Sequence, residues 1–99
     1  MYIYNVTISV DRNVAADWLK WMKTVHIPQV METGHFTDYK MTRILNVDDE
    51  GETYSVQYSF NAMADIEAYQ KDHAPRLQAE TKKHYDGKYV AFRTLLEIV

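Results

Sequence analysis

The sequence contains no cysteine, which excludes disulfide bonds, thiolate metal sites and a cysteine nucleophile. It has only three glycines, and none lies in a glycine-rich phosphate loop, so we expect no nucleotide cofactor. No apolar run reaches the length of a membrane span, and the N-terminus shows no secretory signal. The net charge of −3 provides no basic surface for nucleic acid. These absences predict a cytoplasmic protein that binds neither membranes nor nucleic acid.

Metal-binding patterns are also missing. The four histidines are His26, His35, His73 and His84, and they form neither an HExxH motif nor a pair four residues apart. We therefore expect no metal ion and no organic cofactor. Aromatic residues, by contrast, are plentiful, with eight Tyr, three Phe and two Trp. Aromatic side chains beyond what a small core holds usually line an interface or a pocket.

The chain contains an internal repeat. Tyr-Asn-Val at 4–6 recurs as Tyr-Ser-Val at 54–56, and each half carries one His-x-Pro segment, at 26–28 and 73–75. A length of about fifty residues suits one β-α-β unit, and two such units build one small α+β domain. The repeat therefore predicts a single domain over residues 1–99, composed of pseudo-repeats 1–50 and 51–99.

The predicted order of elements is β-α-β-β-α-β. Alternation of apolar and polar side chains indicates strands, and helical spacing between turn residues indicates two helices. The expected strands span residues 2–10, 36–47, 53–61 and 88–98, and the expected helices run from 14 to 34 and from 62–65 to 86–87. Residues 11–13 are expected to cap the first helix, and the acidic segment 46–52 to join the halves. This order predicts a ferredoxin-like α+β fold, with both helices on one face of a four-stranded antiparallel sheet.

Alternation also assigns side chains to the two faces of the sheet. In the last strand, the set expected to meet the helices is Val90, Phe92, Leu96 and Ile98. The opposite, uncovered face is expected to carry Asn5, Thr7, Ser55, Gln57, Tyr39, Met41, Arg43, Tyr89, Arg93 and Leu95. Tyrosine and arginine are enriched at protein interfaces, and a twofold axis lets one face cover its own copy. We therefore expect a homodimer through this open sheet face.

Several motifs carry a resemblance to known proteins. They are Tyr4-Asn5-Val6-Thr7, Trp18-Leu19-x-Trp21-Met22, His26-Ile27-Pro28, Tyr54-x-Val56-Gln57-Tyr58, His73-Ala74-Pro75 and Phe92-Arg93-Thr94-Leu95-Leu96. The chain resembles the dimeric α+β barrel superfamily, and within it a family of short bacterial proteins of unknown function. The resemblance implies a ferredoxin-like monomer and a homodimer whose sheets pack face to face. It implies no activity, because the superfamily includes cofactor-free monooxygenases, lactone isomerases, EthD-like and YciI-like proteins, and one fold serves many functions.

The two His-x-Pro segments supply the candidate catalytic residues, His73 and His26. Each proline lacks an N–H and clashes with a continuous helix, so we expect both helices to break or kink within two residues of the histidine. His73 follows Ile66 and Tyr69 at helical spacing and is expected to point at the sheet. His26 is expected to lie slightly to one side of the apolar face of the first helix. Two interpretations stay open. Each imidazole either caps the broken helix, or binds a ligand and transfers protons near neutral pH.

The candidate ligand-binding residues are Trp18, Trp21, Tyr58, Tyr69, Arg43 and Arg93. The tryptophans are predicted to cover an aromatic ligand or, alternatively, to belong to the core. Each arginine follows a tyrosine by four residues, and the pair is interpreted either as an anion clamp or as contacts across a dimer interface. The tyrosines complete the expected pocket, which lies between the sheet and the helices near the two helix breaks, with His73 as the histidine expected to line it.

These residues lead to three functional hypotheses. The first is a homodimer that binds a small apolar or aromatic, weakly acidic molecule. The second is an enzyme without metal or cofactor, of isomerase or monooxygenase type, with His26 or His73 as general base. The third is a structural dimer without a ligand. A cavity that touches a histidine favours the first two over the third, and a carboxylate bonded to that histidine favours the enzyme over the binding protein.

Overall fold

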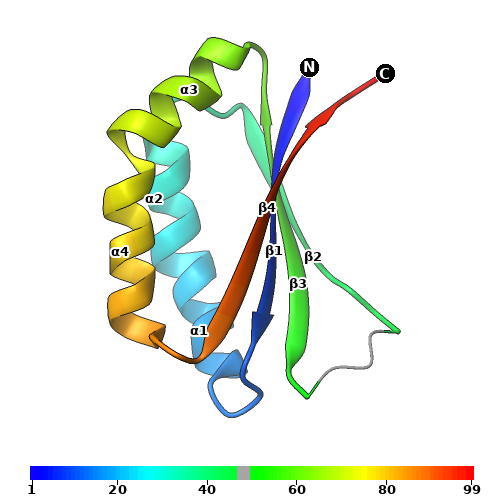
Figure 1. The fold of residues 1–99 in the computed structure, drawn as a ribbon, viewed down its shortest axis with the longest axis vertical. Helices are drawn as coiled ribbons and strands as arrows, with labels where there is room; N and C mark the ends of the chain where they lie inside the picture. Colours follow the sequence, from blue (N-terminus) through cyan, green and yellow to red (C-terminus); the bar gives the residue numbers. More distant parts are fainter. Residues whose placement is uncertain (47–49) are drawn as a thin grey trace.

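The computed structural model describes residues 1–46 and 50–99. Figure 1 shows a four-stranded antiparallel sheet with all the helices packed on one of its faces. The strand order is β2-β3-β1-β4. The elements are β1 (Tyr2–Val10), α1 (Ala15–Trp21), the π-helical turn η1 (Met22–His26), α2 (Ile27–Glu32), β2 (Asp38–Arg43), β3 (Glu52–Phe60), α3 (Met63–Asp72), α4 (Ala74–Tyr85) and β4 (Tyr89–Glu97). The predicted ferredoxin-like fold is confirmed, and three residues of the expected acidic turn, 47–49, lie outside the described residues.

The core forms between the helices and the apolar side of the two central strands. Its largest fully buried side chains include Phe60 from β3, Trp18 from α1, Ile66 from α3 and Leu77 from α4. Burial of one such side chain stabilises the fold by about 1.5–3 kcal/mol. The hydroxyl of Tyr85 donates to Asp17 at 2.7 Å and joins the end of α4 to α1.

The helix boundaries follow from a few local residues. Gly34 and Gly87 adopt φ of 80° and 75°, the left-handed conformation that ends helices and that glycine adopts without strain. The expected N-cap at residues 11–13 is wrong, because the N-cap position is Val14 and no side chain caps it. Asp11 instead accepts a hydrogen bond from the backbone N–H of Asn13 at 2.8 Å. This contact forms a turn before the helix.

Both helical segments are interrupted at a histidine, as predicted, but in different ways. Before Pro28 the chain forms the π-helical turn η1, which ends at His26, and the backbone stays helical throughout. Before Pro75 the chain leaves the helical conformation at His73, with φ −127° and ψ −41°, and α4 begins at the next residue. Single π-helical turns inside α-helices occur frequently at functional sites.

The sheet register corrects the predicted faces of the two outer strands. Arg93 lies opposite Val6 and Tyr89 opposite Val10, and paired residues share a face of the sheet, so both point toward the helices. On β2, Arg43 lies opposite Tyr54, which places it on the same side. The prediction that the open face carries Tyr39, Met41, Arg43, Tyr89, Arg93 and Leu95 is therefore wrong.

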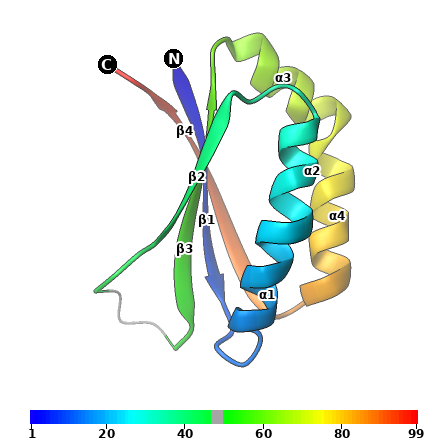
Figure 2. The ribbon, with the colours of Figure 1, turned by 180° about the vertical axis from the view of Figure 1, so that it is seen from behind.

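The residues expected to meet the helices from β4 lie instead on the open face. We call Val90, Phe92 and Leu96 the β4 strip, with exposed fractions of 56%, 66% and 40%. Ile98, just after the strand, is also exposed. The predicted polar part of the open face is correct, because Asn5 pairs with Gln57 and Thr7 with Ser55. Figure 2 shows that no described helix covers this face.

Candidate functional site

A cavity of about 40 Å³ lies between the sheet and the helices. Its sheet side comes from β1, β3 and β4, and its helical side from all the helical segments, including η1. This volume is enough for one or a few water molecules. The cavity therefore admits a small chemical group, and a larger body stays at its mouth unless side chains there move.

The structure brings most of the predicted site residues together at this cavity. The predicted residues that line it are His26, Trp18, Tyr58, Tyr69 and Arg93. Sequence analysis missed further lining residues, among them Tyr4, Gln78, Thr81, Tyr89 and Ala91. Gln78 and Thr81 sit on α4, in a charge-rich stretch that the sequence presents as an ordinary solvated helix face. We call this site the Arg93 cavity.

His26 is the histidine at the cavity. Its ring stacks on Trp21 at 5.3 Å between centroids, and its Nδ1 lies 3.4 Å from the hydroxyl oxygen of Thr81. Burial lowers the pKa of His26 to about 4, and the positive charge of Arg93 acts in the same direction. His26 is therefore a neutral imidazole at neutral pH, which can donate one hydrogen bond and accept another.

The buried imidazole predicts a stability that depends on pH. The unfolded chain binds a proton on His26 near pH 6.5, whereas the folded chain binds it only near pH 4. The fold therefore loses stability as the pH falls from 6.5 toward 4, by about 2 kcal/mol at pH 4.5. Urea unfolding at pH 7 and pH 4.5 measures this loss. We expect a smaller loss for His26→Gln and an unchanged loss for His84→Gln, and equal losses in all three proteins would contradict the burial of a neutral His26.

Arg93 carries the positive charge of the cavity. Burial raises the pKa of Tyr4, and the nearby guanidinium of Arg93 partly opposes this. Arg93 is an exposed residue of β4 that lines the cavity, and it lies beside the hydroxyl of Tyr4, which is only 3% exposed. Among the described residues, Arg93 has no carboxylate partner. Its repeat counterpart Arg43, by contrast, forms an ion pair with Glu52 at 3.0 Å.

Trp18 carries an unsatisfied donor at the same cavity. Its side chain is fully buried, and its indole N–H has no hydrogen-bond partner in the described part of the chain. Burial also raises the pKa values of Tyr58 and Tyr69, so both phenols stay neutral. The residues that line the cavity thus supply one permanent positive charge and a neutral imidazole among aromatic side chains, and the unsatisfied indole N–H belongs to a lining residue that is fully buried.

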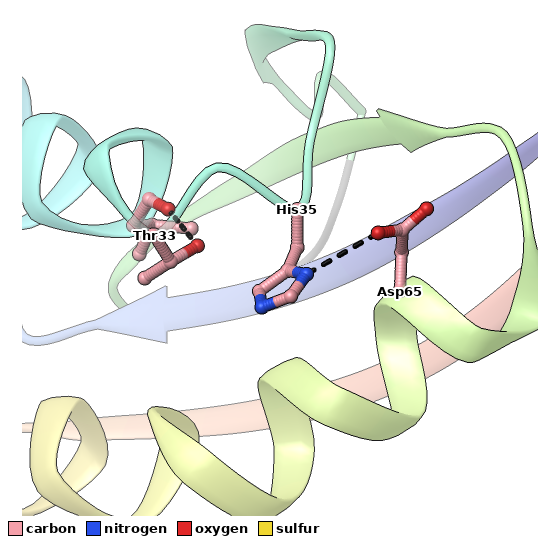
Figure 3. Close-up of polar contacts among 4 residues, drawn as sticks. Thr33, His35 and Asp65 are labelled. Carbon is pink, nitrogen blue, oxygen red and sulfur yellow. Dashed lines mark hydrogen bonds and ion pairs between the residues drawn. The ribbon is translucent and has the colours of Figure 1, made fainter.

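His73 lies outside the cavity, so its predicted position as a lining residue is wrong. Its Nδ1 is 3.4 Å from Arg76 Nη2, and its ring lies 5.5 Å from that of His35. Figure 3 shows His35, from the segment after α2, pointing at Asp65 in the first turn of α3; the two are 3.2 Å apart. No cluster of metal-binding side chains occurs within residues 1–46 and 50–99. Trp21 and Arg43 also lie outside the cavity lining.

The sequence matches one family of proteins. A family model described as "Domain of unknown function (DUF4286)" matches residues 1–99. No curated protein matches the sequence. Within the described residues, no helix has the length and apolarity required to cross a membrane.

Three solved structures share the architecture at low sequence identity. An ethyl tert-butyl ether d (EthD) family protein from Bacillus halodurans C-125 has 13% identity and a TM-score of 0.69, with 100% of both chains covered. A putative antibiotic biosynthesis monooxygenase from Deinococcus radiodurans has 16% identity and a TM-score of 0.72, with 100% of this chain and 93% of that chain covered. A dimeric ferredoxin-like protein of unknown function from Jannaschia sp. CCS1 has 14% identity and a TM-score of 0.67, with 99% and 100% covered.

Proposed function

Since the chain belongs to the DUF4286 family of unknown function, we propose a function from its site: a homodimer that binds a small molecule in the Arg93 cavity. The observation that carries the proposal is the indole N–H of Trp18, a buried donor without an acceptor on a side chain that lines the cavity. A buried unsatisfied donor costs about 1–3 kcal/mol. A group in the cavity that accepts this hydrogen bond removes the cost and is therefore bound favourably.

The open sheet face supports the dimer. The β4 strip exposes three large apolar side chains on one face of one strand, and a second copy related by a twofold axis covers such a strip with itself. The polar centre of the face is suited to burial as well. Ser55 donates to Asn5 at 2.6 Å, and Asn5 donates to Thr7 at 3.1 Å. These groups are satisfied within one subunit, so a partner sheet leaves few polar groups without hydrogen bonds.

The lining of the cavity supports a small ligand with an aromatic or apolar body. Small-molecule sites are mostly apolar, with a few polar groups that fix the orientation of the ligand. Here the polar groups are Arg93, Trp18 and His26, and tyrosines form much of the remaining lining. The small volume admits the polar end of the ligand, so the body of the ligand extends to the exposed part of the lining, which includes Gln78.

A second candidate function is a cofactor-independent enzyme of isomerase or monooxygenase type, with His26 as general base. The position of His26 at the cavity supports it, as does the likeness to a structure described as a putative antibiotic biosynthesis monooxygenase. Two observations favour binding. In the described part of the chain His26 has the Thr81 hydroxyl and no carboxylate as its partner, and a pKa of about 4 makes its imidazole a weak base at neutral pH.

Filling the cavity tests the proposed function. Ala91 lines the cavity from β4, and Ala91→Leu places extra carbon atoms in its volume of about 40 Å³. We expect wild type to bind the neutral probe benzyl alcohol in a ligand-observed NMR titration, and Ala91→Leu to lose that binding. Ala79→Leu, on the exposed side of α4, is the matched control and should bind as wild type does.

Two results would contradict this function. Undiminished binding to Ala91→Leu would place the probe outside the cavity. Absence of binding by wild type to both neutral and acidic aromatic probes would leave the structural dimer without a ligand as the better hypothesis.

A further inference from the structure

We propose that the Arg93 cavity recognises the carboxylate of a small organic acid, with Arg93 as its counter-ion. This inference rests on the proposed function and defines the chemical class of its ligand. It starts from the internal repeat, in which Arg43 and Arg93 hold equivalent positions fifty residues apart, each on the helix-facing side of an outer strand. The two arginines therefore had the same expected role, and their surroundings in the fold distinguish them.

The two arginines differ in their counter-charge. Arg43 Nη2 lies 3.0 Å from a carboxylate oxygen of Glu52, so its charge is already neutralised by the chain. Arg93 forms no ion pair with an acidic side chain within residues 1–46 and 50–99, and its guanidinium lies close enough to the neutral Tyr4 hydroxyl to lower the pKa of that phenol. A guanidinium has five N–H donors in a planar fork. Proximity to the single hydroxyl of Tyr4 leaves donors free for both oxygens of a carboxylate.

The other groups of the cavity favour the same charge. No acidic side chain lines it, and Arg93 is the single charged residue of the described lining. His26 is neutral, and the phenols of Tyr58 and Tyr69 are neutral donors. The indole N–H of Trp18 is a donor and cannot accept. A cationic ligand would meet a positive charge here, whereas an anionic oxygen meets donors.

The size of the cavity suits a carboxylate group that forms one end of a larger molecule. About 40 Å³ holds one or a few waters, which is comparable to the two oxygens of one carboxylate. A single unpaired guanidinium balances one negative charge, so a monoanionic head group fits better than a phosphate monoester with its charge of about −1.5 to −2 at pH 7. The body of the acid then lies against the aromatic side chains at the mouth.

The experiment compares benzoate with benzyl alcohol, which keeps the ring and removes the charge. Dissociation constants are measured by NMR titration for wild type, Arg93→Gln and Arg43→Gln. We expect wild type to bind benzoate about tenfold or more tightly than benzyl alcohol, because hydrogen bonds to charged groups are among the strongest. Arg93→Gln should lose that preference while still binding benzyl alcohol, which shows that the variant is folded with its cavity intact. Arg43→Gln should keep it.

Each other outcome overturns the inference. Equal binding of the two probes by wild type would reject the acid as ligand class and leave the proposed small-molecule function standing. A loss of benzoate binding as large in Arg43→Gln as in Arg93→Gln would indicate general electrostatic attraction rather than a site. Equal loss of both probes in Arg93→Gln would assign Arg93 a packing role. Failure of wild type to bind either probe would reject both the inference and the function on which it rests.

Discussion

Replacement of Trp18 by alanine is expected to lower the free energy of unfolding by about 3–5 kcal/mol, the usual range for removing a large aromatic side chain from a core. Trp18 is fully buried and packs against Tyr54 at 5.2 Å between ring centroids. Small domains have a total stability of about 5–15 kcal/mol, so this loss leaves a marginal fold. Urea denaturation measures the change.

The matched control is the other tryptophan. Trp21 is half-buried, and its ring packs against His26 and Tyr85, so Trp21→Ala should cost less than half as much. Trp18→Phe then separates packing from hydrogen bonding. It keeps most of the buried ring and removes an N–H that has no partner, so it should cost far less than Trp18→Ala. Equal costs for the two alanine variants would contradict the central position of Trp18 in the core.

Replacement of Phe92 by glutamate is expected to convert the proposed dimer to a monomer. Phe92 is 66% exposed in one subunit and lies at the centre of the β4 strip. A twofold interface buries both copies of the substituted residue, and two unpaired carboxylates in an apolar contact are strongly unfavourable. Sedimentation equilibrium should give about twice the 11.7 kDa monomer mass for wild type and the monomer mass for Phe92→Glu.

Tyr39 provides the control for the choice of face. It is also exposed, at 48%, but it lies on the helix-facing side of the edge strand β2. The sequence had placed it on the dimer face, and the register moved it to the other side. Tyr39→Glu should therefore leave the dimer intact. Dissociation by Tyr39→Glu and not by Phe92→Glu would restore the assignment of faces from the sequence and contradict the proposed interface.

The sequence predicted the elements well because their signals are local. Strict alternation at 2–10 and 53–61 matches β1 and β3 to within a residue, and Gly34 and Gly87 mark the two helix ends as expected. The faces of β4 were not predictable in this way. The set that faces the helices includes Arg93 and Glu97, whereas the set on the open face is apolar apart from Thr94. Alternation therefore assigned the more apolar set to the helices, although it lies on the open face.

The sequence selected part of the residue set that meets at the cavity, and the geometry of the fold leaves His73, Trp21 and Arg43 outside it. Trp18, Tyr58, Tyr69, His26 and Arg93 meet at the cavity. His73 was preferred over His26 on helical spacing, but that argument assumed an unbroken helix up to His73, and the chain leaves the helical conformation there. His26 reaches the cavity because the π-helical turn η1 keeps the backbone helical up to it. The sequence did not show that Arg93 lacks an acidic partner, because the residues that surround a side chain in the fold come from distant parts of the chain.

The most direct test of the small-molecule site is the indole N–H region of a ¹H–¹⁵N NMR spectrum during a titration with benzoate and, separately, benzyl alcohol. The chain has two tryptophans and so gives two indole signals, of which Trp18 lines the cavity and Trp21 does not. We expect the Trp18 signal to move and saturate with at least one of the probes while the Trp21 signal changes little. Binding that leaves the Trp18 signal in place, or that moves the Trp21 signal alone, would contradict a ligand site in the Arg93 cavity.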